Sequence, residues 1–469
     1  MARLKRLNPL DASWLAVDSI DTPMHVASLQ IFSLPDDAPA GFMQKLVTQL
    51  KGATDYASPW NLKLRSMAMR RLLPVWQTDD DLDIDFHVRH SALPVPGGER
   101  ELGMLVSRLH SHQLDFSRPL WECHVIEGLE NNRFALYIKM HHSLVDGIAG
   151  MRLLQRVLSD NPKTRGQPPP WAARPESAKP AVTDSPDEPA PVPTPAGVLN
   201  TVMDGVRKQV QSVPDLGRAL SRLIQGGSNG HELTAPFAAP SSILNGRVNG
   251  SRRFATQQYN LAKLKKLAKA ADATLNDVVL WLCSTALRRF LKEANSLPHR
   301  ALTAGIPVNV RPADDQSSGT AISFIMANLA TDVADPRKRL KAIAASAKSA
   351  KEHLQSLPRA ALTQYTMLVM APYILQLLSG MGGRTRPVFN VTISNVPGPD
   401  KPLYLNGAQL EAMYPVSLLS HGQAINITCV SYNGSVNFGF TGARDTLPHM
   451  QNIAVYTGEA LEELEKLYG

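Results

Sequence analysis

The sequence predicts a mixed α/β protein built from two or three domains. With 469 residues, the chain is too long for one core of ordinary size. Strand and helix patterns alternate along the chain on both sides of a proline-rich segment, as is typical of α/β proteins. The two halves are similar in size and in strand and helix content. We therefore expect them to face each other across a cleft.

The first half, residues 1–160, contains the clearest strand pattern. Residues 133–140 place Phe134 and Ile138 on one face and Ala135 and Lys139 on the other, which predicts a half-buried strand. The expected elements are a strand at 24–33, helices at 40–51 and 99–112, and strands at 121–128 and 133–142.

A proline-rich segment separates the halves. Eleven of the 35 prolines lie between Pro162 and Pro195, a composition typical of an extended linker. After it, apolar residues repeat at helical spacing from Val198 to Val210. We assign residues 161–240 to a linker followed by a helix, and residues 241–469 to the second domain.

Predicted helices and strands also alternate along the second half of the chain. Thr274 to Leu291 and the segment opened by Asp335-Pro336 are predicted helices. Asn433-Gly434 predicts a two-residue hairpin. The expected strands are 301–310, 321–331, 389–395, 424–432 and 435–441.

Composition limits the function classes. The three cysteines lie in apolar runs and predict neither a disulfide framework nor a metal site, which fits a reducing cytoplasm. The net charge is +8, but the basic residues are scattered without a nucleic-acid-binding motif, so we expect no nucleic acid partner. An anionic membrane surface or a polyphosphorylated molecule is favoured instead.

No export signal or membrane span is expected. Asn8, Pro9 and Asp11 interrupt the basic N-terminus before an apolar signal core can form. The longest apolar stretch, Met367 to Leu378, is shorter than the ~18 residues that suggest a spanning helix. The chain is expected to be soluble or peripheral.

The strongest chemical motif is His141-His142-Ser143-Leu144-Val145-Asp146-Gly147. If the alternation of the preceding strand continues, His142 points inward and His141 outward. A neutral imidazole facing a shielded cavity can take a proton from a hydroxyl near neutral pH. The alternative interpretation is structural: the histidines finish a strand, Asp146 caps a helix and Gly147 relieves a tight turn.

Together with motifs along essentially the whole chain, these residues resemble the bacterial wax ester synthase/acyl-CoA:diacylglycerol acyltransferases. That family lies within the condensation-type acyltransferases, which include chloramphenicol acetyltransferase. The histidine motif alone is shared by many acyltransferases, so it indicates the chemistry and not the substrate. The motifs that point to this branch are Leu10-Asp11-Ala12-Ser13-Trp14, Pro23-Met24-His25-Val26, Asp115-Phe116-Ser117-Arg118-Pro119-Leu120-Trp121, Asn276-Asp277, Pro307-Val308-Asn309-Val310-Arg311 and Ser394-Asn395-Val396-Pro397-Gly398-Pro399. The resemblance implies two chloramphenicol acetyltransferase-like α/β domains that face each other across a substrate tunnel.

The resemblance implies that His142 is the general base. It would deprotonate the acceptor hydroxyl, whose oxygen attacks the thioester directly, so Ser143 need not be a nucleophile. His141, Asp146 and Gly147 complete the catalytic motif. Asp146 is expected to pair with an arginine and so fix the motif loop, and Arg118 and Arg311 are both possible partners.

A donor to the oxyanion is also expected, because acyl transfer passes through a negatively charged tetrahedral intermediate. Asn276 is the candidate, with Asp277 holding the local structure. Thr274 to Asp277 is at the same time a helix-capping pattern, and we interpret Asp277 as mainly structural.

Substrate binding is assigned to two segments. Asn395 and Gly398, in a loop after the strand at 389–395, could close over the tunnel or could form only a turn. The apolar side chains of Met367, Met370 and Leu375 could line a channel for a long acyl chain. They could equally belong to a buried helix or to a surface patch at a lipid interface.

The resulting hypothesis is transfer of a long-chain acyl group from acyl-CoA to a fatty alcohol or diacylglycerol. Acyl-CoA is a substrate here, and no cofactor is expected. The enzyme would work in the cytoplasm, peripheral to the inner membrane or to lipid inclusions. Two alternatives stay open: a different alcohol or amine acceptor, or a non-catalytic coat protein of lipid inclusions.

Overall fold

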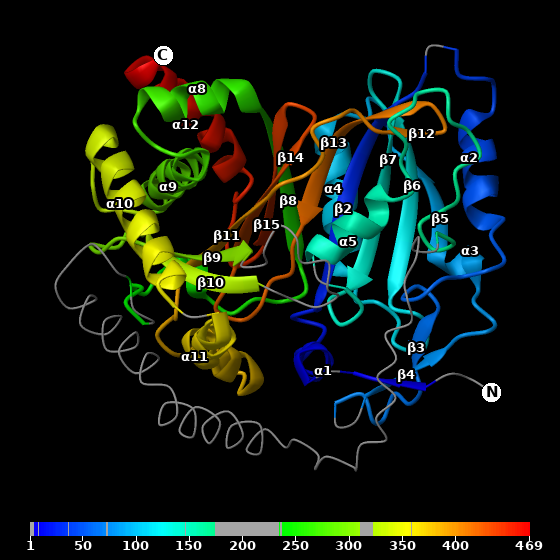
Figure 1. Ribbon diagram of the computed structural model, residues 1–469, viewed down its shortest axis with the longest axis horizontal. Coiled ribbons are helices and arrows are strands. Elements are labelled where there is room, and N and C mark those ends of the chain that lie inside the picture. The colour runs from blue at the N-terminus through cyan, green and yellow to red at the C-terminus, as the bar shows by residue number, and fades with distance from the viewer. Residues whose placement is uncertain are drawn as a thin grey trace.

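The computed structural model describes residues 4–7, 9–35, 37–71, 74–145, 147–173, 234, 237–309, 322–357 and 359–469. Two six-stranded sheets with helices around them form most of this part of the chain, and a third sheet has three strands (Figure 1). The predicted mixed α/β class is confirmed. The expected helix at 198–210 and most of the expected linker lie outside the described residues.

The first sheet has the strand order β12-β13-β2-β7-β6-β5. β7 is antiparallel to both β2 and β6, whereas β5 is parallel to β6. Four of the strands come from the first half: β2 (His25–Ser33), β5 (Val88–Ala92), β6 (Trp121–Leu129) and β7 (Arg133–His141). The strands expected at 24–33, 121–128 and 133–142 are confirmed.

Helices cover both faces of this sheet. α2 (Phe42–Lys51) packs on the face that carries Phe134, and α4 (Glu99–Ser111) packs on the face that carries Tyr137. β7 is therefore buried on both faces. The expectation of a half-buried strand is wrong, because α4 lies where the alternating pattern suggested solvent.

The second half contributes two strands to the first sheet. β13 (Ala408–Val416) pairs antiparallel with β2, and β12 (Tyr404–Leu405) continues the sheet beyond it. In Figure 1 the orange β13 lies next to the blue β2. The two halves of the chain are thus interlocked, and a division near residue 240 does not separate the two sheets.

The second sheet has the order β10-β9-β11-β14-β15-β8. Figure 1 shows α8, α9, α10 and α12 gathered on one side of it. The strands are β8 (Arg252–Asn260), β9 (Thr303–Asn309), β10 (Ile322–Asn328), β11 (Val391–Val396), β14 (Ile425–Tyr432) and β15 (Ser435–Ala443). The helices are α8 (Leu261–Ala270), α9 (Leu275–Glu293), α10 (Pro336–Gln355) and α12 (Asn452–Tyr468).

Local signals in the sequence explain two of these elements. Asn433 and Gly434 have φ values of 41° and 76°, the left-handed pair that a tight hairpin turn requires, and they join β14 to β15. α10 begins where Asp335 accepts a hydrogen bond from the Lys338 N–H at 2.8 Å, with Pro336 at the first helical position.

Smaller elements complete the described chain. None of the described helices has the length and apolar character needed to cross a membrane. α11, which contains the apolar run from Met367, contacts α1. The remaining elements are β1 (Leu4–Arg6), α1 (Pro9–Val17), β3 (Leu62–Leu64), β4 (Val75–Thr78), α3 (Ile84–His87), α5 (Gly147–Gln155), the short helix Ile243–Asn245 and α11 (Arg359–Leu378).

The first residues of the expected linker pack on the first half. Trp171 is fully buried, stacks on Trp121 with ring centroids 4.9 Å apart, and donates its indole N–H to the Leu50 carbonyl at 3.1 Å. Trp171 therefore belongs to the apolar core of the first half, whereas most of residues 161–166 are exposed. Proline content alone gave no sign that an aromatic anchor ends this segment.

Replacing Trp171 with alanine is expected to lower the free energy of unfolding by about 3–5 kcal/mol, because it leaves a large cavity beside Trp121. Chemical denaturation measures this, with the exposed Lys163→Ala as a control in the same segment. A change within about 0.5 kcal/mol, as for an ordinary surface substitution, would contradict this packing.

Candidate active site

The histidine motif follows directly on β7. The His141 N–H donates to the Leu120 carbonyl at 2.9 Å, and the His142 N–H donates to the Met24 carbonyl at 2.8 Å. The Leu144 N–H then closes a turn onto the His141 carbonyl at 3.0 Å. The backbone of the motif is thus hydrogen-bonded to two other segments of the first half.

The side chain of His141 is buried, with 1% exposed. Its Nδ1 lies 3.1 Å from the Ser143 backbone N and 2.6 Å from Ser143 Oγ. Because a backbone N–H can only donate, Nδ1 must accept, and the proton of the neutral ring is on Nε2. That Nε2 lies 3.4 Å from Asp18 Oδ2. The expectation that His141 points outward is wrong, since the sheet has no solvent-facing side here.

Asp18 follows α1 and is also 1% exposed. Its Oδ2 accepts a hydrogen bond from the Met24 N–H at 2.7 Å, and its Oδ1 accepts one from the side-chain amide of Gln113. A buried carboxylate is tolerated when hydrogen bonds satisfy it. Asp18 therefore connects the end of α1 to the start of β2 and to the motif.

His142 differs from its neighbour in exposure and in contacts. Its side chain is half-buried, and its ring lies against Trp14 of α1, with ring centroids 4.5 Å apart and planes inclined by 36°. Of the two motif histidines, His142 therefore has the larger exposed fraction. The inward orientation expected for it stays a prediction.

Ser143 is 3% exposed, and its hydroxyl contacts His141 Nδ1. Ser143, His141 and Asp18 form a chain of the residue types found in serine hydrolases. A nucleophile has to reach its substrate, however, and this hydroxyl is enclosed. The chain is better suited to holding the turn than to forming a covalent intermediate.

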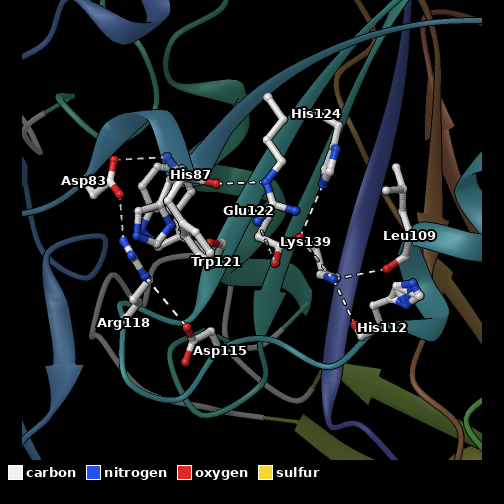
Figure 2. Close-up of polar contacts among 12 residues, drawn as sticks. Asp83, His87, Leu109, His112, Asp115, Arg118, Trp121, Glu122, His124 and Lys139 are labelled. Atoms are coloured by element: carbon white, nitrogen blue, oxygen red, sulfur yellow. Dashed lines mark hydrogen bonds and ion pairs between the residues drawn. The ribbon is translucent and has the colours of Figure 1, made fainter.

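A buried ion network lies on β6 and β7 below the motif (Figure 2). Lys139 Nζ lies 3.3 Å from Glu122 Oε2 and donates to the carbonyls of Leu109 and His112 at 3.1 and 2.9 Å. His124 Nε2 lies 3.3 Å from the same Glu122 oxygen. The ammonium group thus sits at the C-terminal end of α4, where the helix dipole favours a cation.

The charges of this network change its pKa values. Burial raises the pKa of Glu122, but the hydrogen bond from His124 and the charges of Lys139 and Arg89 outweigh burial and hold it at about 2. Burial lowers the pKa of Lys139 and of His124. Two further buried histidines lie nearby: burial lowers the pKa of His110 to about 3 and that of His25 well below its ordinary value.

The Asn276-Asp277 pair lies at the start of α9. Thr274 and Asp277 form a capping box in which Asp277 accepts from the Thr274 N–H at 2.9 Å and hydroxyl at 2.7 Å. The structural interpretation of Asp277 is confirmed. Asn276 is half-buried and stands outside the capping box, and its oxyanion role stays a prediction.

Asn395 is expected in a loop, but it lies on β11, in register with Cys429 of β14. The Cys429 thiol donates to Asn395 Oδ1 at 3.5 Å. Strand pairing continues to Val396 because β14 runs alongside. A Cβ at Gly398 would collide with the Ser431 carbonyl, so this glycine permits a close approach to β14. These contacts give both residues a structural role, and a role in closing the tunnel stays a prediction.

Two of the three apolar residues assigned to an acyl channel can be placed on α11. Met370 packs partly against the second core, whereas Leu375 is 43% exposed. Met367 lies on the same helix, and its side chain is outside the described residues. The structure thus combines two of the expected alternatives, a core contact and a surface position, on one helix.

Asp146 and one of its two possible arginine partners, Arg311, lie outside the described residues. Arg118, the other possible partner, pairs with Asp83 at 2.9 Å and lies 3.7 Å from Asp115 (Figure 2). Gly147 begins α5, and its backbone alone is described.

Sequence reasoning did not single out Asp18, and it gave Trp14 no role of its own. Trp14 and Asp18 are four positions apart in the sequence, the spacing of residues that would share one face of a helix. In the structure, Asp18 directly follows the last residue of α1. Trp14 belongs to a motif that carried the family resemblance, so that spacing could have drawn attention to the pair. Among the described residues, no group of three or more His, Cys, Asp or Glu is arranged to hold a metal ion.

Comparison with known proteins gives family matches along most of the chain. The family model described as the wax ester synthase/diacylglycerol acyltransferase catalytic domain matches residues 7–279, and that of the C-terminal domain matches residues 318–465. A Mycobacterium tuberculosis protein, provisionally named a diacylglycerol O-acyltransferase, is 45% identical over 98% of this chain and 97% of its own length. The O-acyltransferase WSD of Acinetobacter baylyi is 40% identical, with coverage of 98% and 97%.

Solved structures show the same relationship. The wax ester synthase/diacylglycerol acyltransferase from Marinobacter aquaeolei VT8 superposes with a TM-score of 0.81 at 37% identity, covering 99% of this chain and 100% of that one. The first condensation domain of the CDA synthetase superposes with a TM-score of 0.56 at 14% identity, covering 99% and 96%. That identity shows a shared fold alone.

The fold is shared with a condensation domain, and the family model that matches residues 7–279 defines the chain as an acyltransferase. Within this class, the matches cover nearly the whole chain. The chain belongs to the wax ester synthase/diacylglycerol acyltransferase family.

The low pKa of Glu122 predicts a loss of stability in acid. The folded state keeps this carboxylate ionised down to about pH 2, whereas its ordinary pKa is 4.5. The resulting stabilisation is complete above pH 4.5 and is lost as the pH falls toward 2, an effect of about 3 kcal/mol.

Glu122→Gln should remove this part of the pH dependence. Urea unfolding of both proteins from pH 7 to pH 3 measures it. Burial of His25 and His110 weakens both proteins alike below about pH 6.5. His124 loses its Glu122 partner in the variant, so the difference between the two proteins reports Glu122 together with its contact to His124. Parallel stability curves would contradict the assignment.

Proposed function

We propose that this chain transfers a long-chain fatty acyl group from acyl-CoA to the hydroxyl of a fatty alcohol or of diacylglycerol, forming a wax ester or triacylglycerol. The observation that carries the proposal is the different environment of the two motif histidines. His141 is enclosed with Ser143 and Asp18, whereas His142 is half-buried against Trp14. The name of the relative at 45% identity supplies diacylglycerol as an acceptor, and the names of the family model and of the Marinobacter structure supply wax ester synthesis.

In the proposed mechanism His142 is the general base. Its ring nitrogen takes the proton of the acceptor hydroxyl while the hydroxyl oxygen attacks the thioester carbonyl. The tetrahedral intermediate collapses, the carbon–sulfur bond breaks, and the proton passes from His142 to the departing sulfur of coenzyme A. The transfer is direct and needs no cofactor, and the buried hydroxyl of Ser143 supports a route without an acyl-enzyme.

Asn276 is proposed as a donor to the oxyanion of that intermediate. The capping box of α9 engages Thr274 and Asp277 but not Asn276. The acyl chain is proposed to lie along α11, which carries Met367 and on which Met370 and Leu375 are at least partly exposed. This is supported by the contact between α11 and α1, because α1 carries the Trp14 ring that touches His142.

We further propose a cytoplasmic enzyme with peripheral contact to the inner membrane or to lipid inclusions. Leu375 and Met381 expose 43% and 41% of their side chains near the end of α11. Basic residues flank them: Arg247 donates to the Gly380 carbonyl at 3.1 Å, and exposed Arg384 follows Met381 closely. Apolar side chains among cations suit the surface of an anionic bilayer.

His142→Ala is expected to lower acyl transfer by about 10²–10⁴-fold, the usual contribution of a general base. Release of free thiol from palmitoyl-CoA with hexadecanol, and then with diacylglycerol, measures it. Wild type should release thiol only when an acceptor is present. Unchanged transfer by the variant, or wild-type release that ignores both acceptors, would refute the proposed function.

Met381→Asp is expected to weaken binding to vesicles of phosphatidylglycerol and phosphatidylcholine by about 5-fold, the effect of roughly one unfavourable charge near an anionic surface. Val455→Asp is the matched control, because Val455 is also an exposed apolar residue but lies on α12. Co-sedimentation measures both variants. Equal losses, or none, would exclude the α11 end as the contact surface.

A further inference from the structure

We propose that Trp14 and Asp18 are positioning residues for acyl transfer, each acting on a different histidine of the motif. Neither residue has a role in the mechanism described above. The inference rests on the proposed function, in which His142 is the general base. The two residues form what we call the α1 clamp.

Asp18 reaches the motif by one route through His141. The acceptor role of His141 Nδ1 toward the Ser143 N–H requires the ring proton on Nε2, which lies 3.4 Å from Asp18 Oδ2. A ring with its proton on Nδ1 would present two donors to each other at 3.1 Å. The carboxylate therefore favours the tautomer that the turn needs.

A second route runs through the backbone. Asp18 Oδ2 accepts from the Met24 N–H at 2.7 Å, and the Met24 carbonyl accepts from the His142 N–H at 2.8 Å. Together the two routes fix the residues on both sides of His142 and the backbone of His142 itself. A group held in this way loses little freedom when the substrate binds.

Trp14 acts on the ring. Its indole lies 4.5 Å from the imidazole of His142, centroid to centroid, so it limits how far that ring can turn. Trp14 lies on α1 and Asp18 directly follows the last residue of that helix, so the same end of α1 supports the ring of His142 and the enclosed ring of His141. The position of α1 and the orientation of the base are then linked.

The first test is the tautomer of His141 in the wild-type protein. Nitrogen-15 NMR of histidine-labelled protein, assigned by the signal lost in His141→Gln, distinguishes a neutral ring with its proton on Nε2 from the other forms. The expected result at pH 7 is the Nε2–H form. A proton on Nδ1 would overturn the role of Asp18, whatever the folding of any variant.

The second test separates positioning from stability. Asp18→Ala is expected to lower kcat by about 10–100-fold, as loss of an orienting partner does, with KM for palmitoyl-CoA and hexadecanol within about 3-fold. The matched control is Glu122→Gln, which removes another buried carboxylate of the same half without contact to the motif. Equal kcat losses in both variants, or a loss confined to KM, would overturn the proposal.

A rescue variant guards against misfolding. In Asp18→Asn with Gln113→Glu, the asparagine oxygen can accept from Met24 while its amide donates to the new carboxylate, so the hydrogen bonds at position 18 are remade in reverse. Its kcat is expected within about 5-fold of wild type. A rescue variant that folds well but has a kcat about 100-fold below that of wild type would overturn the hydrogen-bonding role of Asp18.

Trp14 is tested by a pair of substitutions. Trp14→Leu keeps an apolar side chain but no ring, and it should lower kcat by about 10-fold or more with little change in KM, whereas Trp14→Phe should recover most of kcat. Wild-type kcat in Trp14→Leu, or a change in KM alone, would overturn the role of Trp14. If His142→Ala stays active, the proposed function fails; if only these variants stay active, the α1 clamp alone fails.

Discussion

The position of His142, the proposed general base, depends on the pairing of β2. The first residue of β2 is in register with His141, and the residue before it accepts the hydrogen bond from the His142 N–H. The other edge of β2 pairs with β13, a strand from the second half of the chain. One strand therefore sets the motif against the segment that begins with Asp18 and also joins the two halves. A slip of one residue would turn every side chain of β7 to the opposite face, so the place of the base follows from sheet register.

The same register places polar side chains between the sheet and α4, where burial is costly. Glu122 and Lys139 are directly opposite each other on β6 and β7, and a buried charge is tolerated only with a partner and with hydrogen bonds. Lys139 meets both conditions, because its remaining donors reach carbonyls at the end of α4. α4 is thus fixed over the motif strand by charge as well as by apolar contacts. This explains why a strand that ends in a catalytic motif can be buried on both faces.

Signals between near neighbours predicted much of the fold. The alternation before His141, the capping box at Thr274 and the Asn433-Gly434 turn are all local, and the structure has each of them. Contacts between distant segments left no such pattern. Alternation cannot show that α4 covers the second face of β7, so the burial of His141 was missed. The pairing of β13 with β2 and the contact of Asp18 with His141 likewise join segments that are far apart in sequence. The need for Gly398 arises only from its close approach to Ser431.

The order of exposure along the motif bears on the mechanism. Successive residues at the end of a strand point to opposite sides, so His141 and His142 enter different environments although they are adjacent. Ser143, His141 and Asp18 have the residue types of a nucleophile, a base and its orienting acid, but all three are at least 97% buried, with 3%, 1% and 1% exposed. If Ser143, His141 and Asp18 catalysed acyl transfer through a covalent intermediate, the half-buried His142 beside them would have no role. If His142 moves the proton instead, the buried chain has a task that suits its enclosure, because hydrogen bonds shielded from water hold a turn more firmly than exposed ones. The division of roles in direct transfer therefore accounts for both histidines, whereas a covalent route accounts for one.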